Sequence, residues 1–147
     1  MRLYLIEAHI YIVLIMKRVP LILLADDNPD DHTFIRDAFT YVNANVELKI
    51  LDSGQELLQH LKFVRDEDLP SLIVLDYNMP KLNGAEVLKI LLKEERYKHI
   101  PKIILSTSYF RVHIDHCIKI GANGYLIKPD NLFSWKKIAL NMLEYVK

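Results

Sequence analysis

Short runs of apolar residues alternate with helical patterns along most of this chain. A continuous apolar run of this length is typical of a strand buried on both faces, and strands that alternate with helices are typical of a doubly wound parallel sheet. We therefore predict an α/β domain built on a five-stranded sheet. The predicted strands lie at residues 21–25, 46–51, 72–75, 102–105 and 125–127.

Helical patterns fill the intervals between these runs. Asn28 and Pro29 are typical of a cap and a first helical residue, and Asp30 and Asp31 follow in a first turn, where acids are favoured. We interpret Asp30 and Asp31 as charges of the helix start and not as ligands. Further helices are predicted around Leu57 to Leu61, Val87 to Leu92, Ile114 to Ile118 with Gly121 as the cap, and at residues 131–146.

Residues 1–18 do not follow this pattern, and we treat them as an extension that precedes a domain at residues 19–147. The apolar run from Ile10 to Met16 is too short to span a bilayer, which needs about 20 apolar residues. Three interpretations stay open: an upstream start outside the domain, an added strand or helix that covers the domain or a partner, and a contact with a membrane surface. After the last helix we expect no output domain.

The composition narrows the class of protein. The chain has 147 residues, which suits one domain, and its 19 basic side chains balance 19 acidic ones. The chain therefore has no basic excess of the kind that would indicate a nucleic-acid partner. The single cysteine, Cys117, excludes an intrachain disulfide and fits the reducing cytoplasm.

Carboxylates stand directly after two of the predicted strands. Asp76 follows the run at residues 72–75, and Asp26 and Asp27 follow the run at residues 21–25. Ligands of parallel sheets bind at the carboxyl ends of the strands, so we expect these three side chains to meet at one edge. Crowded carboxylates resist ionisation unless a cation lies among them. A hard divalent ion such as Mg²⁺ matches their oxygen atoms best.

Two more strand ends supply complementary groups. Lys128 follows the fifth predicted strand, and a lysine is a compact point charge suited to phosphate oxygens. Ser106 follows the fourth strand and offers a hydroxyl group. Acids, a lysine and a hydroxyl on successive strand ends predict a site for a phosphoryl group on Mg²⁺. Asp76 is then the expected nucleophile, because Asp26 and Asp27 can hold the metal together and an aspartate can form an acyl phosphate.

Taken together, these motifs resemble the receiver domain of two-component response regulators. One such motif occurs by chance, whereas the whole set in this order and spacing is specific. The resemblance covers residues 19–147, and its details are similar to stand-alone receivers found beside bacterial phytochrome-type and other hybrid sensor kinases. The matching positions are Asp26 and Asp27, Asp76 to Pro80, Gly84 at a helix start, Ser106, Tyr125, and Lys128 with Pro129.

The resemblance implies a flavodoxin-like sheet with strand order 2-1-3-4-5. It also implies that Mg²⁺ is held by Asp26, Asp27, the phosphoacceptor Asp76 and the backbone carbonyl of Asn78.

Lys128 would pair with the oxygens of the bound phosphoryl group. Ser106 and Tyr125 would form the switch that changes the binding surface after phosphorylation. The family most often has threonine where this chain has Ser106, and serine keeps the hydroxyl group. Tyr125 could instead be a core aromatic residue, and Ser106 could merely satisfy a backbone group.

The function implied is that of a single-domain response regulator. It would receive a phosphoryl group from a sensor histidine kinase or a histidine phosphotransfer protein and signal by binding an unknown protein target. We expect an aspartyl-phosphate carrier and not an enzyme with other substrates, located in the cytoplasm, without a nucleic-acid partner or a membrane span. A homodimer stays open.

Two other classes of protein are weighed against this function. Phosphatases of the haloacid-dehalogenase type carry a second aspartate two residues after the nucleophile, and Asn78 occupies that position here. A receiver-like module that binds partners without phosphorylation would usually lack one of the acids or the lysine, whereas this chain has them all. Covalent phosphate on Asp76 would separate this last class from a phosphorylated receiver.

Overall fold

The structure is a computed structural model, and it describes residues 2–15 and 18–146. Five parallel strands form one sheet in the order β2-β1-β3-β4-β5. Both the parallel α/β fold and the strand order predicted from the sequence are confirmed. The strands are β1 (Leu21–Ala25), β2 (Glu47–Leu51), β3 (Leu72–Asp76), β4 (Lys102–Ser106) and β5 (Gly124–Ile127).

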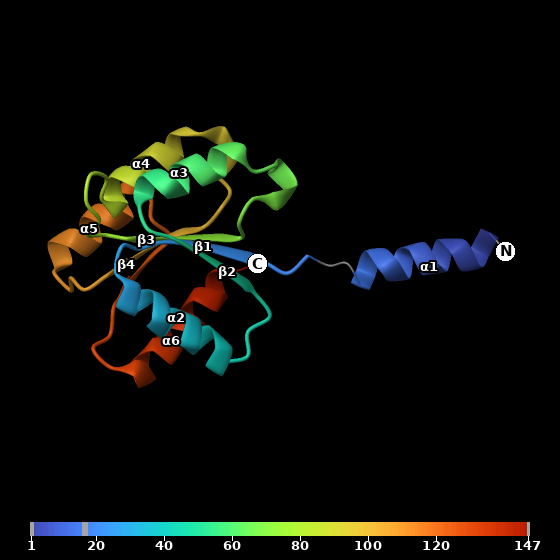
Figure 1. Cartoon of the computed structure of the whole chain (residues 1–147). Helices are drawn as coiled ribbons and strands as arrows, with labels where there is room; N and C mark the ends of the chain where they lie inside the picture. The colour runs from blue at the N-terminus through green and yellow to red at the C-terminus, as the bar shows by residue number, and fades with distance from the viewer. Residues whose placement is uncertain (1, 16–17, 147) are drawn as a thin grey trace.

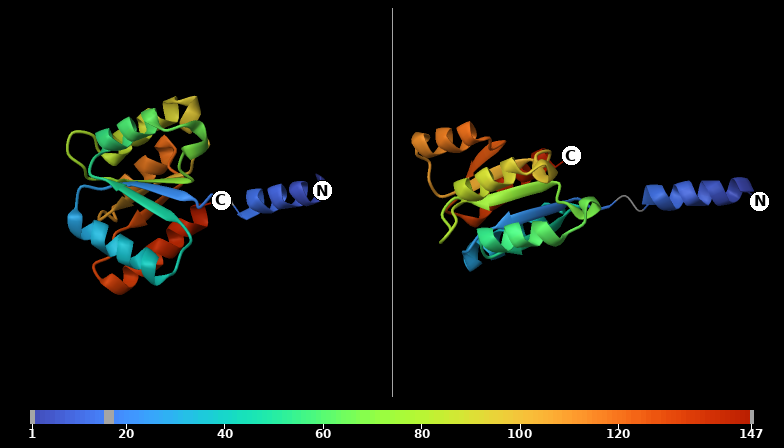
Figure 2. Two further views of the ribbon diagram at one scale, coloured as in Figure 1. Left: turned by 45° about the vertical axis from the view of Figure 1, so that its right-hand side comes forward. Right: turned by 90° about the horizontal axis from the view of Figure 1, so that it is seen from above.

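Helices cover both faces of the sheet, as Figures 1 and 2 show. On one face, α2 (Pro29–Tyr41) and α6 (Leu132–Tyr145) pack against each other. On the other face lie α3 (Gly54–Phe63), α4 (Gly84–Lys93) and α5 (Arg111–Ile120). This arrangement is the doubly wound one, and it buries the strands between two layers of helices.

The core divides along the alternation of side chains in each strand. In β1, Ile22 and Leu24 belong to the cluster beneath α2 and α6, whereas Leu23 belongs to the cluster beneath α3, α4 and α5. Successive strand residues point to opposite faces, so a run that is apolar at every position can fill both clusters. Full burial of each such side chain stabilises the fold by roughly 1.5–3 kcal/mol.

Short polar motifs set where the helices begin and end. Asn28 caps α2 by accepting a hydrogen bond from the backbone of Asp30 at 2.9 Å, as the sequence predicts. Asn83 and Glu86 form a capping box at the start of α4. Gly121 has a φ of 129° at the end of α5, a conformation that favours glycine.

Two short 3₁₀ turns were missed by the sequence analysis. They are η1 (Asp66–Asp68), in the connection before β3, and η2 (Glu95–Tyr97), before β4. Three residues are too few to show a hydrophobic period, so their sequences carry no signal.

Lys102, at the start of β4, is fully buried and donates to the carbonyl oxygen of Ile100 at 2.6 Å. Burial lowers the pKa of this lysine to about 8.

The N-terminal helix α1 (Arg2–Ile15) lies apart from the domain in Figures 1 and 2. Its large apolar side chains, such as Leu3, Leu5 and Tyr11, are more than half exposed. No helix among the described residues is long and apolar enough to cross a membrane. Met16 and Lys17, which belong to the predicted extension at residues 1–18, lie outside the described residues. The boundary after residue 18 stays a prediction.

Arg18 is the first described residue after this helix, and its side chain contacts the domain. Its guanidinium donates to the carbonyl oxygen of Glu67 at 2.6 Å and pairs with the carboxylate of Asp68 at 2.5 Å. The chain entering β1 is therefore held by η1 and not by α1.

A protein that begins at Met16 should keep the stability of the full chain. It retains Arg18 and every strand, and the side chains of Arg2 to Ile12 that it loses are exposed. Changes confined to exposed positions usually alter the free energy of unfolding by less than about 0.5 kcal/mol, so the melting temperature should shift by about 2 °C or less. Thermal unfolding followed by circular dichroism measures this. A larger drop would show that residues 1–15 pack on the domain.

Candidate functional site

The acidic cluster predicted from the sequence forms at the carboxyl ends of β1 and β3. Asp76 is the last residue of β3, and Asp26 and Asp27 directly follow β1. One carboxylate oxygen from each of the three lies within 4.8 Å of the others. Asp26 and Asp76 are buried, whereas Asp27 is exposed. The sheet register produces this meeting, because Ala25 pairs with Leu75 and the next residue on each strand is the acid.

Lys128 brings a cation into the cluster. Its Nζ lies 2.8 Å from Oδ2 of Asp26 and 3.2 Å from Oδ2 of Asp76, and only 6% of its side chain is exposed. The backbone N–H of Lys128 donates to the carbonyl oxygen of Ser106 at 2.7 Å, which extends the pairing of β5 with β4. The lysine therefore comes from a strand two places away from Asp76 and still reaches it.

A third carboxylate reaches the same ammonium group. Asp31 accepts a hydrogen bond from Lys128 through Oδ2 at 2.7 Å. Asp31 does lie in the first turn of α2, as predicted, but the sequence analysis took it only for a charge of the helix start. No spacing rule connects it with Lys128, since the two residues are 97 positions apart. The partnership appears only in the folded domain, where the first turn of α2 and the residue after β5 meet at the same edge of the sheet.

Burial dominates the protonation of this cluster. It raises the pKa of Asp76 to about 6, with the charge of Lys128 opposing the shift and that of Asp26 adding to it. Burial also raises the pKa of Asp26, against the contact with Lys128. For Lys128 burial alone would lower the pKa, but its hydrogen bonds and charge contacts with Asp26, Asp31 and Asp76 hold the pKa above its ordinary value. The lysine is therefore a fixed positive charge.

One buried carboxylate oxygen of the cluster is a candidate metal ligand. Oδ1 of Asp26 accepts from the backbone of Asn28 at 2.8 Å. Oδ2 of Asp26 touches the ammonium group of Lys128, but it is a buried side-chain oxygen without a hydrogen-bond partner among the described residues. A hard cation between Asp26, Asp27 and Asp76 would satisfy this oxygen. The residues present therefore fit a divalent ion.

Backbone contacts hold Asp76 at the end of β3. The N–H of Asn78 donates to Oδ1 of Asp76 at 3.2 Å, which places Asn78 next to the carboxylate. A Cβ atom on Gly84 would lie 2.4 Å from the carbonyl oxygen of Asp76, so only glycine lets α4 begin this close to the strand end. The metal contact expected from the carbonyl group of Asn78 stays a prediction.

The two expected switch residues lie on neighbouring strands. Ser106 ends β4, is fully buried, and accepts a hydrogen bond from the backbone of Ser108 at 3.0 Å. Tyr125 of β5 is half-buried, and its hydroxyl donates to the carbonyl oxygen of Ser108 at 2.8 Å. Both side chains thus contact the same loop between β4 and α5. Their roles in switching stay predictions.

Two histidines near the site were not singled out from the sequence. His32 shares a short hydrogen bond with the carbonyl oxygen of Asp26 through Nε2. His113 shares a hydrogen bond of 2.7 Å with Ser108 and stacks on Tyr77, with ring centroids 5.4 Å apart. A lone histidine on a helix has no sequence signature, so only the fold shows these contacts.

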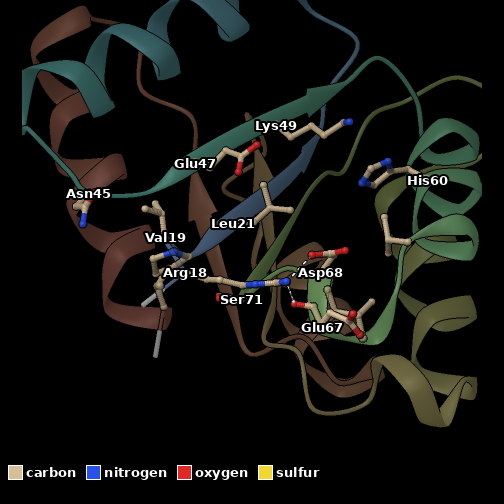
Figure 3. A pocket seen from close by; sticks show the side chains of 14 residues that line it. Arg18, Val19, Leu21, Asn45, Glu47, Lys49, His60, Glu67, Asp68 and Ser71 are labelled. Carbon is tan, nitrogen blue, oxygen red and sulfur yellow. Dashed lines mark hydrogen bonds and ion pairs between the residues drawn. The ribbon is translucent and has the colours of Figure 1, made fainter. Parts of the chain in front are cut away.

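A groove lies elsewhere on the domain. It has a volume of about 860 Å³ and is lined by residues at the amino ends of the strands, such as Leu21 and Glu47. Figure 3 shows this groove, with Arg18 reaching across to Glu67 and Asp68. No residue of the acidic cluster lines it. The candidate site is therefore the acidic cluster at the carboxyl ends of the strands and not this groove.

Known proteins are similar to this chain in sequence and in fold. The family model for the response regulator receiver domain matches residues 22–136. The chain is 31% identical over 130 residues to the two-component response regulator ARR6 of Arabidopsis thaliana, covering 84% of this chain and 69% of that protein. It is 30% identical to the phosphorylated cyanobacterial phytochrome response regulator RcpA, with a TM-score of 0.78 over 87% of this chain and 94% of that one.

A metal-bound structure is also similar. The Mn²⁺-bound form of response regulator Rcp1 has a TM-score of 0.75 and 27% identity, covering 87% of this chain and 95% of that chain. The family match spans the acidic cluster and Lys128 as well as most of the sheet and its helices. Sequence, fold and site therefore agree, and the chain belongs to the response regulator receiver domain family.

Proposed function

We propose that this receiver domain accepts a phosphoryl group on Asp76 from a histidine of a sensor kinase or phosphotransfer protein. The observation that carries the proposal is the buried ammonium group of Lys128, which lies 3.2 Å from Asp76 at the metal-capable cluster. A buried carboxylate with a fixed cation beside it is arranged to accept a group that brings negative charge.

In the transfer, an oxygen of Asp76 attacks phosphorus, and the bond between phosphorus and the donor's imidazole nitrogen breaks. The electron pair of that bond stays on the imidazole. Lys128 pairs with the oxygens of the incoming group, since its charge is held by the surrounding carboxylates. A Mg²⁺ ion held by Asp26, Asp27 and Asp76 would neutralise the negative charge that gathers in the transition state.

The proposed output is a change in the protein's binding surface. The hydroxyl of Ser106 would turn from the backbone of Ser108 toward the phosphoryl group. Tyr125, which now holds the carbonyl group of Ser108, would follow the rearranged loop. Phosphorylation would in this way shift a two-state balance and favour binding of a protein target. On this proposal the domain catalyses only its own phosphorylation and dephosphorylation.

The change Asp76→Asn should abolish phosphorylation, because an amide is not a competent nucleophile. Acetyl phosphate with Mg²⁺ should add one phosphoryl group to the wild-type protein, as seen by intact-protein mass spectrometry, and none to the variant. Asp52→Asn is a matched control, since Asp52 follows β2 as Asp26 follows β1 but is largely exposed. This control should be phosphorylated like the wild type. Phosphate on the Asp76→Asn protein would refute the assignment.

Mg²⁺ should raise the melting temperature, because a ligand of the folded state stabilises it by mass action, by about 2.7 kcal/mol at 100 times the dissociation constant. Asp27→Asn should remove most of this gain, whereas Asp37→Asn, at an exposed position of α2, should keep it. A thermal-shift titration with Mg²⁺ at constant ionic strength measures the effect. An equal gain in both variants would contradict a metal site at the cluster.

The rise in melting temperature that Mg²⁺ causes should depend on pH. The pKa of Asp76 is raised from 3.8 to about 6, so the folded state binds this proton more tightly than the unfolded chain does. Without metal, Asp76 therefore lowers the stability as the pH rises from about 4 through 6. Mg²⁺ competes with that proton, so its stabilising effect should be full above pH 7 and shrink below pH 6.

A further inference from the structure

The ammonium group of Lys128 has more acidic partners than the metal cluster accounts for. Asp26 and Asp76 belong to the cluster, but Asp31 does not, and it comes from the first turn of α2. Its carboxylate is 14% exposed, so the pair with Lys128 is largely shielded from water. Charged hydrogen bonds that are shielded in this way are stronger than those on the surface.

The three contacts of the ammonium group are not equivalent. Asp31 lies at 2.7 Å with hydrogen-bond geometry. Asp26 lies at 2.8 Å as an ion pair, and Asp76 is the most distant at 3.2 Å. Asp31 is therefore the closest of the three partners, and it helps to fix where the end of this flexible side chain lies.

Phosphorylation would affect these contacts differently. An acyl phosphate on Asp76 removes the negative charge of that carboxylate and offers phosphoryl oxygens to Lys128 instead. Asp31 carries no part of the transferred group, so its contact can persist before and after the transfer. An ammonium group has three protons, and Asp31 would hold one of them while another stays directed at the reacting centre.

We propose that Asp31 is a positioning residue, which holds the ammonium group of Lys128 in place for the incoming phosphoryl group. This inference rests on the proposed function, because it concerns the same transfer to Asp76. The alternative is that Asp31 only supplies negative charge to the first turn of α2. Asp30 does that as well and provides the matched control, since it is exposed in the same turn and makes no ion pair with Lys128 in the described structure.

The test compares Asp31→Asn and Asp30→Asn with the wild type. Phosphorylation by acetyl phosphate is followed against Mg²⁺ concentration, which gives a rate at saturating Mg²⁺ and an apparent Mg²⁺ affinity. Asp31→Asn replaces a hydrogen bond between two charged groups with a weaker one to a neutral amide, so it should lower the saturated rate about tenfold. Its apparent Mg²⁺ affinity should change less than twofold, because Asp31 lies outside the metal cluster. Asp30→Asn should change neither quantity.

An unchanged or faster rate for Asp31→Asn would overturn the inference, as would an equal slowing of Asp30→Asn. A loss that excess Mg²⁺ fully restores would also overturn it, since Asp31 would then act through the metal. Circular dichroism confirms that each variant folds.

A second measurement does not depend on phosphorylation. In ¹⁵N-lysine-labelled protein, the ammonium signal of Lys128 should be visible by NMR, because buried hydrogen bonds slow the exchange of its protons with water. Lys128→Arg identifies the signal by removing it. The signal should weaken or vanish in Asp31→Asn and persist in Asp30→Asn, and its persistence in Asp31→Asn would overturn the inference. If the wild type takes no phosphate, the proposed function fails, while this signal still tests the contact between Asp31 and Lys128.

Discussion

The buried ammonium group of Lys128 is the interaction on which the site depends. A carboxylate transferred from water into a protein interior loses hydration, at a cost of several kcal/mol per ion when it is unpaired. Asp26 and Asp76 are both buried, and Lys128 is the cation within reach of both. Removing the lysine would leave two like charges facing each other, so the site depends on the geometry that delivers it.

The fold delivers that geometry by simple means. Parallel strands end at the same edge of the sheet, and the register places the acids at the ends of β1 and β3 side by side. Lys128 follows β5, and its side chain reaches these acids past the end of β4. Gly84 lets α4 start against the backbone of Asp76, and Asn28 turns the chain from Asp26 into α2. That same turn carries Asp31 back to the lysine. The first turn of α2 thus also contributes to the site.

Much of this arrangement was predictable from the sequence, for physical reasons. Apolar runs identified the strands because both faces of a parallel sheet are buried, and polar residues at the ends of the runs identified Asp26, Asp76, Ser106 and Lys128. The contact of Asp31 was not predictable, since it joins two residues that are 97 positions apart and meet only in the folded domain. The hydrogen bond between His113 and Ser108 escaped for a similar reason. A helix in the N-terminal extension belonged to only one of three open interpretations, because Arg2, Glu7 and His9 interrupt the apolar residues before Ile10 and leave no clear period.

The central claim is that one phosphoryl group binds Asp76 among Lys128, Ser106 and the acidic cluster. A crystal structure with Mg²⁺ and beryllium trifluoride, a stable mimic of a phosphoryl group, tests it most directly. The account predicts the beryllium on a carboxylate oxygen of Asp76, the metal against Asp26 and Asp27, and fluorine atoms within hydrogen-bond distance of Lys128 and Ser106. A mimic bound at another residue, or an acidic edge that stays empty at saturating concentrations of both, would contradict it.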